Sequence, residues 1–379
     1  MKKRSWMGRV LCAVSILFVC LASCSETNTK SQSENISEKV GDTVVVNNTL
    51  LKPSGPKPSW GSTITDPNQV VMDKLASYGT PPLTTLTPAE VRTKPSPATA
   101  AADVMKENNI PMPASNVEIV NRTIPVSGAQ IPVRIYTPKT GKASYPVIVY
   151  YHGGGWVIAD LDTYNASAES LANMAEAIVI SVAYRQGPEF KFPTAHNDSY
   201  GAYEWVIKNV TGIKGDSSRI ALVGESAGGN LAASVSMMAR DKKVKMPIHQ
   251  ILVYPIASYD TTSASYQKYA SAKPLDRPLM GWFFKHYLNS PADGKNPMIS
   301  LVNANLKALP PTTIIGAEID PLQSEGKLLG DKLRAAGVST TYQLYNGVTH
   351  EFFGMAAIIP EAKQAQQLVV DNLKSAFNK

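Results

Sequence analysis

The chain has 379 residues, of which 44% are hydrophobic, and its formal net charge is +7. Four basic residues and no acidic residue lie in positions 1–23, so without this segment the net charge falls to +3. That charge is too small to indicate a nucleic-acid partner, and no stripe of basic residues with interleaved aromatics occurs. The length and composition suit one large globular domain with an inserted or appended piece.

The first residues have the pattern of a bacterial lipoprotein signal peptide. A basic start precedes the apolar run 10–22, which is too short to span a bilayer comfortably. The run ends in Leu21-Ala22-Ser23-Cys24, which resembles a lipobox. We therefore predict a signal peptide over 1–23 and a lipid on Cys24 that anchors the protein to a membrane. An ordinary secretory signal with a chance cysteine is the alternative.

Two further inferences follow from this segment. All three cysteines lie in it, so the mature protein has no thiol for a disulfide, a metal site or a nucleophile. Ser25 after the cysteine gives no inner-membrane retention signal of the aspartate kind. The expected location is the bacterial cell envelope, in the outer membrane if the cell has two membranes.

The next part of the chain has little capacity to form a core. Residues 25–48 are mostly polar, and KPSGPKPSWGS (52–62) is rich in proline, so we predict a disordered tether over 24–62. Asp66-Pro67 and Thr87-Pro88 are typical helix starts. Residues 63–115 are therefore predicted to form short, amphipathic N-terminal cap helices.

From residue 117 onward, strand and helix patterns alternate. Alternating apolar and polar residues on either side of Ser127-Gly128 predict a hairpin, and later β-branched runs predict strands buried on both faces. Strands are expected at 117–124, 130–136, 146–151, 177–182, 219–223, 250–254, 312–316 and 340–344. Helices are expected at about 163–175, 194–210, 227–240, 321–336 and 361–377. The predicted fold class is α/β, with a mostly parallel sheet covered by helices on both faces.

Four chemically distinctive features follow predicted strands, where ligands bind in open parallel sheets. GESAGGN (224–230) contains a G-x-S-x-G motif in which Ser226 would occupy a strained strand-to-helix turn. In HGGGW (152–156), three glycines without side chains leave backbone N–H groups accessible, and such groups can bind a negatively charged oxygen. Asp320 and His350 follow the last two strands.

The order Ser226, Asp320, His350 is the order of a nucleophile, its carboxylate and its base in α/β-hydrolases. A serine hydroxyl needs a base within hydrogen-bond reach, and the base needs a carboxylate to fix its tautomer. Each feature alone is weak, and the conclusion rests on their combination. Glu318 is a rival for the carboxylate, and His152 is expected to anchor the glycine loop rather than act as a base.

Taken together, HGGGW, GESAGGN, DPLQSEG (320–326) and HEF (350–352) resemble the bacterial hormone-sensitive-lipase-like esterases, a branch of the α/β-hydrolases. The resemblance runs from about residue 66 to the end and implies a catalytic domain over 116–379. It also implies hydrolysis of small-molecule carboxylic esters without metal or cofactor, beneath a cap completed by an insertion near 258–300. Glu225 departs from the Asp or Thr usual in the family, and Gln186-Gly187 departs from the usual Leu-Ala.

In this interpretation Ser226, Asp320 and His350 form the catalytic triad. Backbone N–H groups of Gly154, Gly155 and Ala227 hold the oxyanion, and Gly153 shapes the loop. Residues considered for the substrate pocket, with core packing as the alternative for each, are Trp156, Tyr164, Met280 and Trp282. The expected enzyme is a carboxylesterase-type serine hydrolase for short to medium acyl chains. An acyltransferase or amidase with the same nucleophile, or a non-catalytic binding lipoprotein, remains open.

Overall fold

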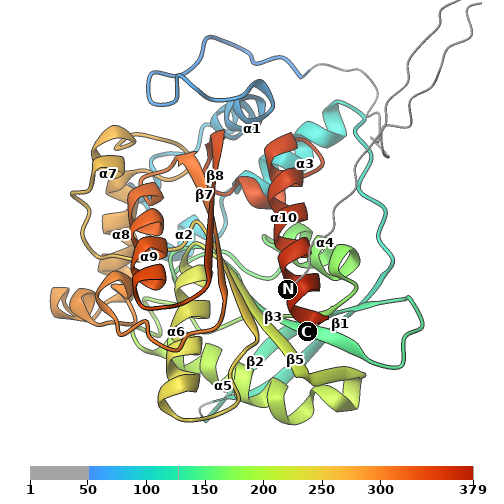
Figure 1. The fold of residues 1–379 in the computed structure, drawn as a ribbon. Coiled ribbons are helices and arrows are strands. Elements are labelled where there is room, and N and C mark those ends of the chain that lie inside the picture. The colour runs from blue at the N-terminus through green and yellow to red at the C-terminus, as the bar shows by residue number, and fades with distance from the viewer. Residues whose placement is uncertain (1–50, 127, 379) are drawn as a thin grey trace, which may run out of the picture. The chain divides into compact units, whose positions relative to one another are not determined.

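An eight-stranded β-sheet is the centre of the structure, a computed structural model that describes residues 51–126 and 128–378 (Figure 1). The strands lie in the order β1-β2-β4-β3-β5-β6-β7-β8. β1 and β2 form an antiparallel hairpin, β2 pairs antiparallel with β4, and the remaining neighbours are parallel. Their bounds are β1 (Val117–Val126), β2 (Ala129–Pro138), β3 (Tyr145–Tyr151), β4 (Ile178–Val182), β5 (Gly215–Glu225), β6 (His249–Val253), β7 (Thr312–Ile319) and β8 (Thr340–Thr349).

Alternate residues of the central strands face two different cores. In β3, Val147 and Val149 belong to one apolar cluster, while Ile148 and Tyr150 belong to the other. This two-sided burial is the reason that the strands are continuous apolar runs in the sequence. The mostly parallel sheet predicted from these runs is confirmed.

Helices cover both faces of the sheet, and in Figure 1 they lie on opposite sides of β7 and β8. The first cluster includes residues of α5 (Thr194–Asn209), α6 (Ala227–Asp241) and α9 (Gln323–Ala335). The second includes residues of α1 (Asp66–Ser77), α3 (Pro97–Glu107), α4 (Asn165–Ala175) and α10 (Pro360–Phe377). The order of strands and helices places the carboxyl ends of β3, β5, β7 and β8 at one edge of the sheet, where the residues of interest follow.

β5 and β8 extend furthest beyond the predicted ranges. β5 begins at Gly215 because this residue pairs with Tyr145 across an irregular step in the register. β8 continues to Thr349, which pairs with Ile319 after a second irregularity. Polar residues and glycine in these extensions gave no apolar run to detect. As a result His350 follows the sheet directly rather than through a loop.

The chain between β6 and β7 forms a separate group of short elements. It contains α7 (Ala264–Lys268), α8 (Arg277–Tyr287) and the 3₁₀ turns η3 (Pro291–Lys295) and η4 (Leu301–Asn303). The N-terminal part adds η1 (Leu83–Thr85) and α2 (Pro88–Val91), and two further turns are η2 (Val210–Ile213) and η5 (Phe352–Gly354). The Trp282 indole donates to the carbonyl of Leu86 at 3.2 Å, so α8 contacts the N-terminal helices.

Part of the tether predicted for residues 24–62 belongs to the folded body, which corrects the expected boundary. The backbone N–H and hydroxyl of Ser54 both donate to the carboxylate of Asp73 on α1. The side-chain amide of Gln69 donates to two carbonyls of the same proline-rich stretch at 3.0 Å. The segment therefore binds α1 both as a donor, through Ser54, and as an acceptor, through the carbonyls of Gly55 and Pro56. Cys24 and the predicted signal peptide lie outside the described residues.

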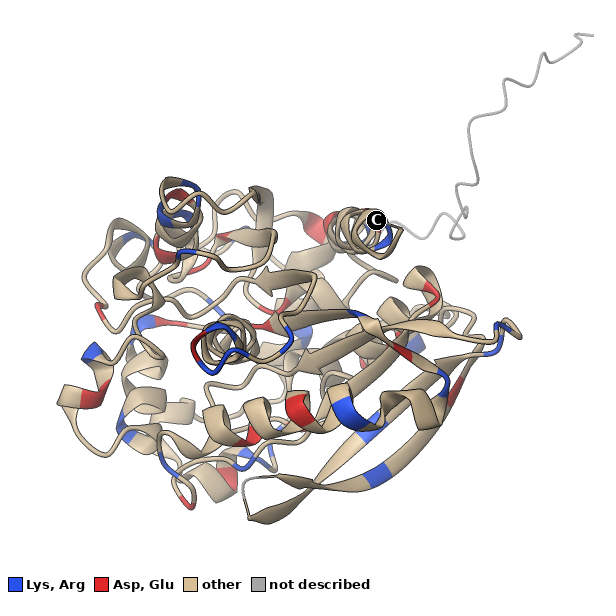
Figure 2. Ribbon diagram, turned by 60° about the horizontal axis from the view of Figure 1, so that its bottom comes forward, with Lys and Arg blue, Asp and Glu red and all other residues tan. Residues whose placement is uncertain are grey.

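Two surface properties bear on possible partners. No helix within 51–126 or 128–378 is long and apolar enough to cross a bilayer. Basic and acidic residues are interspersed over the elements in Figure 2. In that view, neither sign of charge forms a stripe along the described part of the chain.

The contacts of the proline-rich segment predict a stability difference between two N-terminal truncations. A protein that starts at residue 63 should melt roughly 8–16 °C below one that starts at residue 51, because four hydrogen bonds are lost. The lost hydrogen bonds contribute roughly 1 kcal/mol each, and each kcal/mol moves the Tm of a large domain by about 2–4 °C. Differential scanning calorimetry of both proteins measures the shift. Equal melting temperatures would show that the segment adds nothing to the fold.

Candidate active site

Ser226 lies on a strained turn between β5 and α6, with φ 55° and ψ −116°. A Cβ on Gly224 would lie 2.0 Å from the carbonyl oxygen of Gly228, and one on Gly228 would lie 1.9 Å from that of Tyr151. Both positions therefore require glycine, as the motif predicted. The Ser226 N–H donates to the carbonyl of Val253 at 2.8 Å, which ties the turn to β6.

Three side chains form a hydrogen-bonded chain at the carboxyl ends of β5, β7 and β8. His350 Nε2 is 2.9 Å from Ser226 Oγ, and its Nδ1 is 2.7 Å from Asp320 Oδ2. Asp320 also accepts the N–H of Leu322 at 2.8 Å, which orients its carboxylate. Burial disfavours a charged His350, but the charge and hydrogen bond of Asp320 outweigh burial and raise the pKa of the imidazole.

The glycine loop after β3 has a backbone that only glycine adopts easily. Gly154 and Gly155 have φ of +94° and +57°, and a Cβ on Gly153 would lie 2.1 Å from the Tyr164 hydroxyl. Within the described residues no acceptor takes the N–H groups of Gly154, Gly155 or Ala227, the first residue of α6. These unpaired donors have the chemistry that an oxyanion requires.

Comparison with known proteins identifies the family. A family model described as the α/β-hydrolase fold matches residues 148–354. The carboxylesterase NlhH of Mycobacterium tuberculosis is 37% identical over 267 residues, which are 69% of this chain and 84% of that protein. An ethyl acetate hydrolase of Pseudomonas putida is 33% identical over 251 residues, 65% of this chain and 79% of that protein. The chain belongs to the hormone-sensitive-lipase-like esterases.

Solved structures agree with this membership. A thermostable esterase from Pseudomonas putida superposes with a TM-score of 0.76 at 30% identity, covering 83% of this chain and 98% of that one. An esterase from Pyrobaculum calidifontis gives a TM-score of 0.70 at 36% identity, covering 77% and 95%. The α/β-hydrolase fold and the carboxylesterase-type enzyme predicted from the sequence are confirmed.

His152 of this esterase is buried beneath the glycine loop. Its Nδ1 lies 2.8 Å from the carbonyl oxygen of Gly153, and its ring stacks on Tyr184 with centroids 4.4 Å apart. The Tyr184 hydroxyl donates to the carbonyls of His152 and Gly153. Burial lowers the pKa of His152 to about 4, so the imidazole is neutral near neutral pH. These contacts suit the anchoring role expected for it.

Glu225, the variable residue of the serine motif, is buried on the far side of the turn. Its carboxylate accepts the hydroxyls of Tyr150 and Tyr254. Burial raises the pKa of Glu225 to about 7, while the two tyrosine hydrogen bonds act in the opposite direction. The ring of Tyr254 lies 4.5 Å from that of His350, so this network supports the imidazole from behind. Sequence reasoning did not find either tyrosine.

Glu351 is a second side chain that sequence reasoning missed. It follows His350 with φ 70°, an uncommon conformation for glutamate, and both of its carboxylate oxygens accept the Tyr164 hydroxyl at 2.6 and 2.7 Å. Its position next to the histidine in HEF was the available signal. Glu318, the rival carboxylate, instead accepts the Thr63 hydroxyl and the N–H of Gly347.

The four residues considered for the substrate pocket are all buried. Trp156 is fully buried and stacks on Tyr287 with centroids 4.9 Å apart. Met280 is 1% exposed, and Trp282 is held by its hydrogen bond to the carbonyl of Leu86, which lies between η1 and α2. Tyr164 alone of the four hydrogen-bonds to a residue adjacent to the triad. In this structure Trp156 and Met280 therefore have core packing, the alternative to a place in the substrate pocket.

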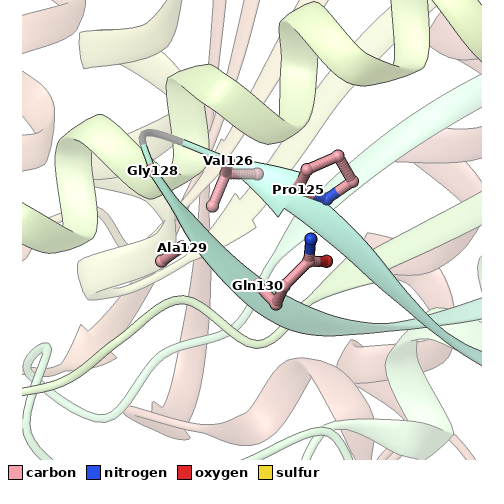
Figure 3. Close-up of a pocket in the computed structure, with 5 residues that line it drawn as sticks. All are labelled: Pro125, Val126, Gly128, Ala129 and Gln130. Atoms are coloured by element: carbon pink, nitrogen blue, oxygen red, sulfur yellow. The ribbon is translucent and has the colours of Figure 1, made fainter.

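Two hollows lie away from this site. One of about 400 Å³ lies at the tip of the β1–β2 hairpin, where Pro125, Val126, Gly128, Ala129 and Gln130 line it (Figure 3). The other, of about 470 Å³, lies at the amino ends of β6, β7 and β8. Neither is lined by Ser226 or His350. Nor do three His, Cys, Asp or Glu side chains gather as possible metal ligands in the described part of the chain.

The geometry of Gly155 predicts a coupling with α8. A Cβ on Gly155 would lie 2.2 Å from the ring of Phe283, so the substitution Gly155→Ala should displace the N–H groups of the glycine loop. We expect kcat/KM for p-nitrophenyl acetate to fall by about 10²-fold or more. In a Phe283→Ala background the factor by which Gly155→Ala lowers kcat/KM should be at least about tenfold smaller, because the ring has been removed. Steady-state kinetics of the wild type, the two single variants and the double variant gives the energetic coupling between the two substitutions. Gly281→Ala, whose Cβ meets nothing within 4 Å, is the control. Equal costs in both backgrounds would contradict the steric explanation.

Proposed function

We propose that this esterase hydrolyses esters of short to medium acyl chains through an acyl-enzyme on Ser226. The observation that carries the proposal is the continuous hydrogen-bonded chain from Asp320 through His350 to the Ser226 hydroxyl. With Nδ1–H donating to Asp320, the neutral imidazole keeps the Nε2 lone pair for the serine proton. This arrangement turns a weak hydroxyl into a nucleophile.

The reaction proceeds in two acyl-transfer steps. His350 takes the Ser226 proton as Oγ attacks the ester carbonyl, and Asp320 stabilises the imidazolium. The unpaired N–H groups of Gly154, Gly155 and Ala227 receive the developing oxyanion. His350 then protonates the leaving alcohol, and water releases the acid by the same route.

Two observations support the shorter acyl chains. The ring of Phe283 on α8 lies directly against Gly155, so a bulky side chain stands beside the proposed oxyanion loop. One relative, at 33% identity, is named for hydrolysis of ethyl acetate, whose acyl group has two carbons. Both favour a restricted acyl site.

Hydrolysis of p-nitrophenyl acetate, butyrate, octanoate and palmitate by residues 51–379 tests the proposal. Rates should be highest for acetate or butyrate and negligible for palmitate, and Ser226→Ala should lower kcat by at least about 10⁴-fold. Circular dichroism should show that the variant is folded. A preference for palmitate would overturn the chain-length assignment. Equal rates for both proteins would overturn the serine mechanism, and p-nitroanilides would then test the amidase alternative.

We further propose that a lipid on Cys24 anchors the enzyme in the bacterial cell envelope. The support is the Leu21-Ala22-Ser23-Cys24 sequence at the end of a short apolar run behind a basic start. The full-length protein expressed in a bacterium should incorporate labelled palmitate and sediment with membranes, in the outer-membrane fraction if the host has two membranes. Cys24→Ser should do neither. Labelling of the variant, or a wild-type protein without label, would refute the anchor.

A further inference from the structure

Two carboxylates flank the imidazole of His350. Asp320 lies at Nδ1, as described, while Oε1 of Glu351 lies 3.9 Å from Nε2. Nε2 is the nitrogen that faces Ser226 Oγ. Glu351 therefore stands on the reacting side of the base, and the proposed mechanism gives it no role.

The Glu351 carboxylate is held in place but not saturated. Among the described residues a single donor, the Tyr164 hydroxyl, is shared between its two oxygens, which together offer about four lone-pair positions. The Glu351 side chain is 21% exposed, whereas the side chains of His350 and Asp320 are 4% and 0% exposed. Among these three side chains, Glu351 is the most accessible to water.

The strained backbone conformation of Glu351 indicates a functional constraint at this position. A left-handed backbone at φ 70° costs a non-glycine residue roughly 1–2 kcal/mol, and glycine would adopt it freely. Tyr164 is the N-cap residue of α4 and lies against Gly153, so its hydroxyl joins the His350 turn to the glycine loop. Strain retained next to a reacting group points to a functional constraint.

We propose that Glu351 positions the water that hydrolyses the acyl-enzyme, an inference that rests on the proposed function. Once Ser226 Oγ is acylated, it has no hydrogen to donate to Nε2. One water molecule can then donate one O–H to Nε2 and the other to Glu351, because acceptors 3.9 Å apart are spanned by two hydrogen bonds of about 2.8 Å. The lone pairs of that water are left to face the acyl carbon.

Deacylation then proceeds in two stages. The water oxygen forms a bond to the acyl carbon, one water proton passes to His350 Nε2, and the carbonyl electron pair moves to the oxyanion. Collapse of the tetrahedral intermediate breaks the bond between carbon and Ser226 Oγ, and Oγ takes the proton back from His350. The second hydrogen remains with the acid product. Glu351 accepts a hydrogen bond throughout and exchanges no proton, so it is a positioning residue.

This role makes the enzyme a hydrolase rather than an acyltransferase. A small alcohol has a single O–H, and His350 requires it for proton transfer. Glu351 can therefore orient water but not an alcohol, and the acyl-enzyme should react with water in preference to alcohols of similar size.

The test measures how the acyl-enzyme partitions between water and methanol. Residues 51–379 and the Glu351→Gly variant are given p-nitrophenyl butyrate with added methanol, and butyrate and methyl butyrate are quantified. Burial raises the pKa of Glu351, so the assay is run at about pH 8, well above the ordinary carboxyl range. Glu351→Gly should raise the ratio of ester to acid roughly tenfold, the factor expected for one hydrogen bond to a charged group. It should also enlarge the initial burst of p-nitrophenol, since deacylation is slowed more than acylation.

Four controls separate positioning from a structural effect. Glycine suits φ 70°, so the variant should keep the wild-type melting temperature, and added formate should restore part of the water preference. Tyr164→Phe should shift the ratio in the same direction because it frees the carboxylate. Glu318→Gln, a nearby carboxylate that binds Thr63 and Gly347, should leave the ratio unchanged.

An unchanged ratio in Glu351→Gly, with wild-type Tm, would overturn the positioning role. Absence of any Ser226-dependent p-nitrophenol release from the wild-type protein would instead overturn the proposed function on which it rests.

Discussion

The site depends on one backbone constraint, the passage of β5 into α6 through a single residue. Ser226 has φ 55° there, and the turn brings the backbones of β3, β5 and α6 within contact of one another. Only glycine at positions 224 and 228 permits this approach. The strain is sustained because the Ser226 N–H is bonded to the neighbouring strand β6 and the following helix is buried along most of its length. Its result is a hydroxyl at the N-terminus of a helix, beside unpaired N–H groups.

Three carboxylates lie near this turn, and they differ in burial and in their hydrogen-bond donors. Asp320 is fully buried and its oxygens accept hydrogen bonds from the imidazole and from the N–H of Leu322, so it stabilises the charged form of His350. Glu225 is equally buried but is held by neutral tyrosine hydroxyls, and its pKa rises to about 7. Glu351, partly exposed and bound by one hydroxyl, keeps capacity for a further donor. The three acids thus differ in function because their surroundings differ in polarity and access.

The residues that surround the triad come from parts of the chain that no local pattern connects. Tyr164 meets Glu351 across 187 positions, and Trp282 meets Leu86 across 196. Neither contact joins neighbouring strands: β5, β6 and β7 separate β3 from β8, and Trp282 and Leu86 lie outside the sheet. The periodicity of apolar residues can assign a residue to a strand. It does not indicate which distant side chain will contact that residue. This is why Tyr150, Tyr254 and Glu351 were not anticipated.

The α/β fold, most strand positions and the residues that form the hydrogen-bonded order from Asp320 to Ser226 could be predicted from the amino-acid sequence. Those features depend on local chemistry: apolar runs make strands, and small residues permit sharp turns beside a serine. Other features depend on contacts between distant parts of the chain, which the folded structure alone establishes. Tertiary structure extended β5 and β8 through polar residues by pairing them with neighbours, and it drew residues 51–62 onto α1 through carbonyl and carboxylate acceptors. It also packed Trp156 into the core, since burial depends on what surrounds a side chain in space.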